Sequence, residues 1–121
     1  MPVFINLSNH PFSNWSDEQL SAAKAYGDLV FLPFPVIDPH FGNEEVALEA
    51  ERIIQDIQVV ALEPEATTIH VMGEMTLTYA LVERLKSLGY RCLASTTERH
   101  IWTDADGNKV TAFRFVRFRE Y

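Results

Sequence analysis

The sequence has 121 residues, is 47% hydrophobic and carries a formal net charge of −7 at pH 7. This length fits a single domain over residues 1–121 with a modest core, and the acidity argues against binding to duplex DNA, which needs a basic face. No apolar run could cross a membrane and the N-terminus lacks signal-peptide features, so we expect a cytoplasmic protein without a membrane partner.

The first half of the chain predicts two strands and two helices. Apolar residues 3–7 predict a strand, and residues 8–11 (Ser-Asn-His-Pro) indicate the loop after it. Ser16 is a good N-cap for a short helix, and residues 29–32 predict a second strand. A proline-rich loop follows, and from Asn43 apolar residues recur at the helical spacing, which predicts a long amphipathic helix.

The second half predicts two further strands, a helix between them and a hairpin. Residues 68–72 predict a strand that leads through Gly73 into a helix, and residues 90–94 predict the next strand. We expect a loop at residues 95–99 and a hairpin turning at residues 104–108, which contain Asp-Gly. Strands that alternate with helices predict an α/β fold with a mainly parallel sheet and a C-terminal hairpin.

Basic side chains concentrate near the C-terminus. Residues 91–121 hold six of the ten basic side chains against four acidic ones, a local net charge of +2 in a chain of −7. Arginine and hydroxyl groups suit phosphate oxygens. This distribution predicts a compact anionic ligand, although Arg114 and Arg117 also fit the solvated face of an edge strand.

Three predicted loops should meet at the carboxyl edge of a parallel sheet, where ligands bind in open α/β folds. They span residues 8–15, 73–76 and 95–99. His10 is the best titratable group among them, because its ordinary pKa lies near neutrality. Glu74 fits either a helix N-terminus or contact with a ribose hydroxyl. The expected rim consists of Ser8, Asn9, His10, Glu74, Thr76, Ser95, Thr96 and Arg99.

Familiar cofactor and nucleophile motifs are missing. No G-x-G-x-x-G, P-loop or G-x-S-x-G motif occurs, so no cofactor is expected. Cys92 is interpreted as a buried structural thiol, His70 as a satisfied core histidine and Trp15 as a residue that packs into the core at a helix entrance. No metal is expected, since the one conceivable ligand group would comprise His10, Asp38, His40 and Glu44.

Four segments together resemble small CRISPR-associated Rossmann-like proteins related to the CARF domain, several of which are ring nucleases. They are residues 115–121 (Phe-Val-Arg-Phe-Arg-Glu-Tyr), 94–99 (Ala-Ser-Thr-Thr-Glu-Arg), 6–11 (Asn-Leu-Ser-Asn-His-Pro) and 72–74 (Met-Gly-Glu). The resemblance implies a Rossmann-like three-layer sandwich. It also implies a homodimer that binds cyclic oligoadenylate, such as cyclic tetra-adenylate, across its two-fold axis.

The resemblance further implies a metal-independent cleavage that switches off type III CRISPR signalling. A ribose 2′-OH would attack the adjacent phosphate. Arg99 would stabilise the developing charge, and His10 or Ser8 would orient or deprotonate the 2′-OH. The ligand contacts implied are Asn9, Gly73, Glu74, Thr76, Ser95, Thr96, Thr97 and Arg117. Two alternatives remain: a non-catalytic sensor or sponge for the same messenger, and an unrelated small phosphate-ester hydrolase.

Overall fold

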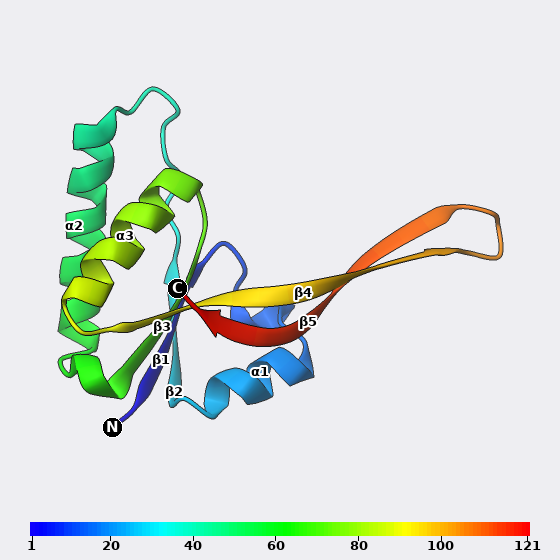
Figure 1. Ribbon diagram of the computed structural model, residues 1–121, viewed down its shortest axis with the longest axis horizontal. Helices are drawn as coiled ribbons and strands as arrows, with labels where there is room; N and C mark the ends of the chain where they lie inside the picture. Colours follow the sequence, from blue (N-terminus) through cyan, green and yellow to red (C-terminus); the bar gives the residue numbers. More distant parts are fainter.

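The computed structural model describes all residues from 1 to 121 and contains one five-stranded sheet with the strand order β2-β1-β3-β4-β5 (Figure 1). β1 pairs in parallel with β2 and with β3, and β3 pairs in parallel with β4, whereas β4 and β5 form an antiparallel hairpin. The α/β prediction is therefore confirmed. The strands are β1 (Val3–Ser8), β2 (Asp28–Pro33), β3 (Thr67–Met72), β4 (Arg91–Thr103) and β5 (Lys109–Glu120).

Helices cover both faces of the sheet and make three layers. α1 (Asp17–Lys24) lies on one face, and α2 (Asn43–Val60) and α3 (Met75–Ser87) lie together on the other (Figure 1). The face under α2 and α3 holds the larger apolar core, of 16 buried residues, and the α1 face holds a smaller core of five. No helix is both long and apolar enough to span a bilayer.

The predicted N-cap begins α1, and a glycine follows its end. Ser16 is the N-cap, and its Oγ accepts a hydrogen bond from the Gln19 backbone N–H at 3.2 Å. Gly27 lies beyond the helix at φ +148°, and a Cβ there would lie 2.4 Å from the carbonyl carbon of Pro2. Only glycine fits this close approach, which brings the chain into β2 beside β1.

The loop predicted at residues 95–99 is wrong, because β4 continues through it to Thr103. Ser95 pairs with Phe118 and Arg99 pairs with Phe113. The two threonines of this segment are β-branched and favour extended backbone, and β5 supplies a hydrogen-bonding partner along its whole length. The hairpin is therefore longer than predicted and begins inside the sheet.

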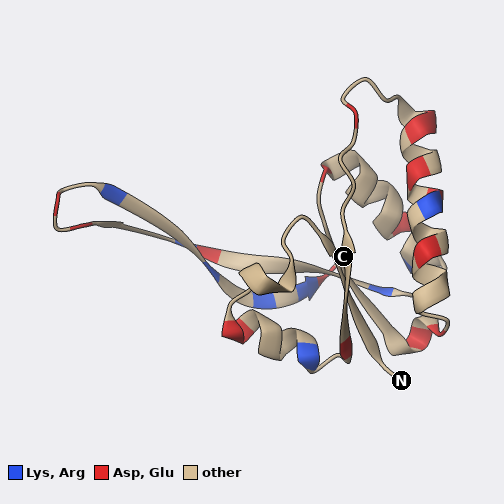
Figure 2. Ribbon diagram, turned by 180° about the vertical axis from the view of Figure 1, so that it is seen from behind, with Lys and Arg blue, Asp and Glu red and all other residues tan.

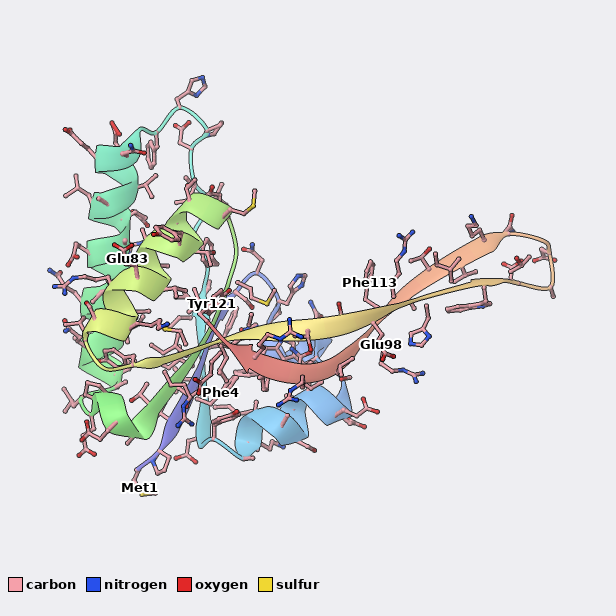
Figure 3. The ribbon with its side chains drawn as sticks, viewed as in Figure 1. Met1, Phe4, Glu83, Glu98, Phe113 and Tyr121 are labelled. Atoms are coloured by element: carbon pink, nitrogen blue, oxygen red, sulfur yellow. The ribbon has the colours of Figure 1, made fainter.

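The distal part of this hairpin, which we call the arm (residues 97–115), projects away from the body (Figure 1). Phe113 is 69% exposed, and Ile101 and Trp102 are each 48% exposed. Phe113 and Glu98 point away from opposite sides of the ribbon (Figure 3). A two-stranded ribbon is marginally stable alone in water, and the arm leaves these apolar side chains exposed beyond the body of the sheet.

Candidate functional site

A row of polar side chains crosses the middle of the sheet on its α1 face. Asn6 of β1 and His70 of β3 are register partners, and both are almost completely buried, at 0% and 3% exposure. Ser95 of β4 is half-buried and lies two residues beyond Leu93, the register partner of His70. Alternate residues of a strand share a face, so Asn6 lies on the same side as Phe4 of the α1-face core.

Hydrogen bonds link this row in one consistent direction. The Gln19 side-chain amide donates to Ser95 Oγ at 3.0 Å, and Ser95 Oγ lies 2.6 Å from His70 Nε2. His70 Nδ1 lies 3.1 Å from Asn6 Oδ1. Because an amide oxygen can only accept, Nδ1 carries the proton and Nε2 accepts the hydrogen bond from the Ser95 hydroxyl. Gln19 therefore donates to Ser95, Ser95 donates to His70, and His70 donates to Asn6.

Asn6 also fixes the loop that follows β1. Its Nδ2 donates to the His10 carbonyl at 2.8 Å, and the Trp15 indole donates to the same carbonyl at 3.0 Å. Ser8 Oγ donates to Asn6 Oδ1 at 2.7 Å, and the His10 N–H donates to Ser8 Oγ at 3.2 Å. The buried polar groups of Asn6 and Ser8 are thus paired, and they fix the main chain of His10 at the end of the loop.

His70 is a neutral histidine at physiological pH. Its pKa falls from 6.5 to about 4, first because burial removes water from the charged ring and second because the charge of His10 opposes it. Aromatic rings surround the imidazole: Trp15 at 5.2 Å, Phe118 at 5.7 Å and Phe4 at 6.4 Å between ring centroids. The apolar wall accounts for the burial, and the ring therefore keeps a free lone pair for the Ser95 hydroxyl.

A cavity of about 480 Å³ opens at the carboxyl ends of β1 and β3. Its wall contains imidazole, amide, hydroxyl and indole groups, but no Asp, Glu, Lys or Arg side chain. The chain has a net charge of −7, but no carboxylate in this wall would repel an anionic ligand. The lining residues are Asn9, His10, Asn14, Trp15, Gln19, His70, Met72, Gly73, Ser95 and Thr97.

Five of the predicted site residues line this cavity: Asn9, His10, Gly73, Ser95 and Thr97. They come from the three segments that the sequence placed at one edge of the sheet. The convergence of the segments after β1 and β3 with β4 is therefore confirmed, although the last of them is a strand and not a loop.

The other predicted residues lie elsewhere. Ser8 is fully buried beneath the loop, and Arg99 lies on the arm, so a catalytic role for either has no support within one chain. Glu74 is the N-cap of α3, and its carboxylate accepts hydrogen bonds from the Thr76 hydroxyl at 2.8 Å and from the Leu77 N–H at 2.9 Å. These bonds, first the one from the Thr76 hydroxyl, lower the pKa of Glu74.

Thr96 and Arg117 contact each other instead of the cavity. The Thr96 hydroxyl donates to the Arg117 carbonyl at 2.9 Å across the hairpin. The Arg117 side chain lines a separate apolar depression between β5 and α1, together with Tyr26 and Phe115. These two residues therefore hold β4 and β5 together at the base of the arm.

The sequence did not indicate a role for Asn6 or Gln19, nor the hydrogen bond between His70 Nε2 and the cavity residue Ser95. His70 is a core histidine, as interpreted, but one of its two partners is the cavity residue Ser95. The available signal was polar residues at the inward positions of two apolar strands. Trp15 and Cys92 are buried as expected, and burial raises the pKa of the Cys92 thiol to about 11.

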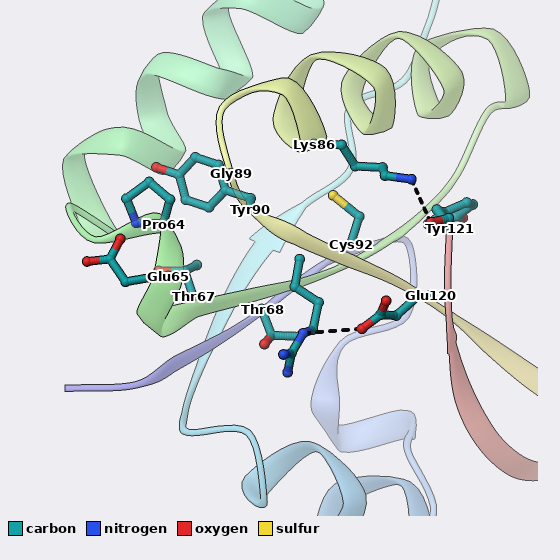
Figure 4. Close-up of a pocket in the computed structure, with 11 residues that line it drawn as sticks. Pro64, Glu65, Thr67, Thr68, Lys86, Gly89, Tyr90, Cys92, Glu120 and Tyr121 are labelled. Atoms are coloured by element: carbon teal, nitrogen blue, oxygen red, sulfur yellow. Dashed lines mark hydrogen bonds and ion pairs between the residues drawn. The ribbon is translucent and has the colours of Figure 1, made fainter.

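A second depression, of about 370 Å³, lies at the amino ends of β3 and β4 (Figure 4). Both of its cations are already engaged. Arg91 Nε lies 3.3 Å from Glu120 Oε1, and Lys86 Nζ donates to the Tyr121 main-chain oxygen at 2.8 Å. With its cations engaged, this depression offers less for an anion than the cavity at the carboxyl ends.

Charge is unevenly distributed over the surface. Acidic side chains follow α2, whereas basic side chains lie on β5 near the sheet (Figure 2). The structure has no group of three or more His, Cys, Asp or Glu side chains able to hold a metal ion. His40 and Asp38 form an exposed pair 3.1 Å apart.

Over residues 2–119 the chain matches the family described as "Uncharacterized protein MJ1673 family", and it belongs to this family. It is also 36% identical over 58 residues to the phenylalanine–tRNA ligase beta subunit of Chlorobium chlorochromatii (strain CaD3). That match covers 48% of this chain and only 7% of the ligase subunit. No solved structure matches the chain significantly.

Proposed function

We propose that this member of the MJ1673 family is a metal-independent ring nuclease that binds and cleaves cyclic oligoadenylate, with cyclic tetra-adenylate as the expected ligand. One observation carries the proposal: a cavity walled by imidazole, amide and hydroxyl groups, without a carboxylate, at the carboxyl ends of a Rossmann-like sheet. Ligands of open α/β sheets bind at this edge. The sequence resemblance to CARF-related proteins supplies the ligand class.

The size of the cavity favours binding of one nucleotide unit of the cyclic ligand in each cavity. A volume of about 480 Å³ is within the ~300–1,000 Å³ typical of small-molecule sites, and it suits a nucleotide unit better than a whole ring of four. A two-fold axis would place two such cavities against one cyclic ligand, because an isologous dimer duplicates every contact. Asn9, Asn14 and Gln19 offer amides for base and ribose, and His10 offers a cation for phosphate.

The homodimer that this arrangement needs has a surface available to it. The arm exposes Ile101, Trp102 and Phe113, and Arg99 is the register partner of Phe113. Burial of these apolar groups against a second copy would stabilise the ribbon. In such a dimer Arg99 would lie at the interface and could contact ligand in the partner's cavity, which it does not reach within its own chain.

The reaction transfers the phosphoryl group of one phosphodiester from the 5′-oxygen to the 2′-oxygen. The 2′-oxygen of a bound adenosine forms a bond to the adjacent phosphorus, and the bond from phosphorus to the 5′-oxygen breaks. The 2′-OH loses a proton and the departing 5′-oxygen gains one, which leaves a linear oligonucleotide with a 2′,3′-cyclic phosphate. Such a site needs alignment and charge stabilisation, and the His10 imidazole lines the cavity where this stabilisation is needed.

The test is incubation of the pure protein with cyclic tri-, tetra- and hexa-adenylate in EDTA, followed by mass spectrometry of the products. We expect a linear product ending in 2′,3′-cyclic phosphate. His10→Ala should slow the reaction by about a hundredfold or more, the usual contribution of a positioned acid or base. His40→Ala, a change at an exposed histidine outside the cavity, is the matched control and should behave as wild type.

Recovery of intact ligand at high enzyme concentration would rule out the nuclease. A thermal-shift measurement then separates the remaining cases, since a ligand that binds the folded state raises the unfolding temperature. A shift with intact cyclic oligoadenylate would indicate a sensor or sponge. A shift with mononucleotides alone would favour a small phosphate-ester hydrolase.

A further inference from the structure

We propose that Ser95 is an activated hydroxyl that passes a proton from the reacting hydroxyl of a bound substrate to His70, which Asn6 holds in the required orientation. Ser95 and His70 would be catalytic, as the groups that transfer the proton, and Asn6 a positioning residue. The proposal rests on the proposed function for one point only, namely that the reacting hydroxyl is a ribose 2′-OH.

The geometry meets the requirements of an activated hydroxyl. A base lies within hydrogen-bonding distance, since Ser95 Oγ and His70 Nε2 are 2.6 Å apart, and a third group orients the base, since Asn6 Oδ1 lies 3.1 Å from His70 Nδ1. This is the arrangement of nucleophile, base and orienting residue that recurs in unrelated folds. Gln19 donates to Ser95 Oγ at 3.0 Å and would stabilise negative charge that develops there.

The direction of the hydrogen bonds leaves the hydroxyl proton of Ser95 only one acceptor among these partners. Gln19 occupies Ser95 Oγ as a donor, so the hydroxyl proton points to His70 Nε2. Asn6 Oδ1 receives a second hydrogen bond from Ser8 Oγ at 2.7 Å, and Asn6 Nδ2 is bound to the His10 carbonyl. Asn6 therefore cannot rotate without breaking three bonds, and the histidine tautomer is fixed.

Ser95 also lies where it can connect the base to a substrate. His70 is 3% exposed, whereas Ser95 is half-buried and lines the cavity. His70 Nε2 presents its lone pair to Ser95 Oγ at 2.6 Å and can accept a proton there. Burial first, and then the charge of His10, its one titratable neighbour in this respect, lower the pKa of His70. A substrate hydroxyl that binds to Ser95 would therefore reach the buried base through a single intervening oxygen.

Proton transfers accompany the exchange of bonds at phosphorus. As the 2′-oxygen bonds to phosphorus, its proton moves to Ser95 Oγ and the Ser95 proton moves to His70 Nε2. The bond from phosphorus to the 5′-oxygen breaks, and the 5′-oxygen takes a proton from charged His10. Afterwards His70 returns its proton through Ser95, and exchange with water restores the starting state of both histidines.

The first experiment probes the hydroxyl without any nucleotide. The full chain is treated with a fluorophosphonate, which bonds to activated serine oxygens with loss of fluoride, and labelling is followed by intact mass and peptide mapping. We expect one adduct, on Ser95, and none in Ser95→Ala. Ser87→Ala, at an exposed serine at the end of α3, should be labelled like wild type. No adduct on Ser95 would overturn the proposal.

His70→Gln separates a proton acceptor from a mere hydrogen-bond partner. The glutamine oxygen can accept a hydrogen bond from Ser95, but it cannot take the proton. We therefore expect the labelling rate of His70→Gln to be about one hundredth of the wild-type rate or lower. An unchanged rate would show that His70 only supports the fold. Because wild-type His70 stays neutral well below its ordinary pKa, the wild-type rate should vary little between about pH 5.5 and 8.

Cleavage of cyclic tetra-adenylate by the same variants then distinguishes the two proposals. His70-dependent labelling without cleavage would support the relay and refute the ring nuclease. Cleavage that survives both Ser95→Ala and His70→Gln would support the nuclease and refute the relay. Loss of both labelling and cleavage in the two variants, with cleavage by wild type, supports both.

Discussion

Burial of neutral His70 makes the stability of this protein fall as the pH is lowered from 7 to 5. Burial and the charge of His10 lower its pKa from 6.5 to about 4 in the folded state. Between these values the unfolded chain binds a proton that the folded chain does not. Proton binding therefore stabilises the unfolded state relative to the folded state as the pH falls, and the stabilisation by His70 is complete only above about pH 6.5.

The magnitude follows from the two pKa values. With 6.5 in the unfolded chain and about 4 in the folded chain, this one group lowers the free energy of unfolding by about 2 kcal/mol between pH 7 and pH 5. A urea dependence of about 1–3 kcal/mol per molar would convert this loss into a midpoint shift of roughly 1 M.

The assay is urea unfolding followed by circular dichroism at a series of pH values. Wild type and His40→Gln, which changes an exposed histidine, should lose stability in parallel over this range. His70→Gln should lose much less, whatever its stability at pH 7. An identical pH dependence in wild type and His70→Gln would refute the reasoning, since the stability change would then come from other groups.

Two further predictions follow from the fold, and a third, on Phe113, follows from the proposed homodimer. Gly27→Ala should cost about 1–3 kcal/mol in chemical unfolding, because its Cβ would clash with the Pro2 backbone; wild-type stability would contradict the described entry into β2. Ser16→Ala should cost about 1 kcal/mol through loss of the α1 cap, and no change would show that α1 is held by packing alone. Phe113→Lys should shift a dimer toward monomer in analytical ultracentrifugation, whereas Val36→Lys, at a position 97% exposed, should not; equal behaviour of the two would remove the arm from the interface.

The order of strands and helices was predictable because its signals are local. The apolar run at residues 3–7 lies within β1, and the helical spacing from Asn43 marks the start of α2. The extent of β4 was not predictable in this way. Whether a polar segment such as residues 95–99 continues a strand depends on a partner strand, and β5 lies about 20 residues away in the sequence.

The residues around the opening of the candidate site could be predicted from the sequence, but the buried residues beneath them could not. Topology alone placed Asn9, His10 and Ser95 at one edge of the sheet, because parallel strands bring their carboxyl ends together. The roles of Asn6 and His70 depend on the register of β1 against β3, which makes the two residues neighbours. Register is a property of the assembled sheet, so the polar residues at inward positions of two apolar strands could mark Asn6 and His70 as unusual but could not show that they are in contact.

The register shift between Thr96 and Thr97 has a mechanical consequence. A bulge bends and twists a strand at one point and interrupts its ladder of hydrogen bonds. The shift therefore separates the direction of the arm from that of the sheet. Ser95 lies on the sheet side of the shift, still paired with Phe118, so the course of the arm is set beyond Ser95. The same strand can thus turn outward into the arm while its Ser95 hydroxyl stays beside His70.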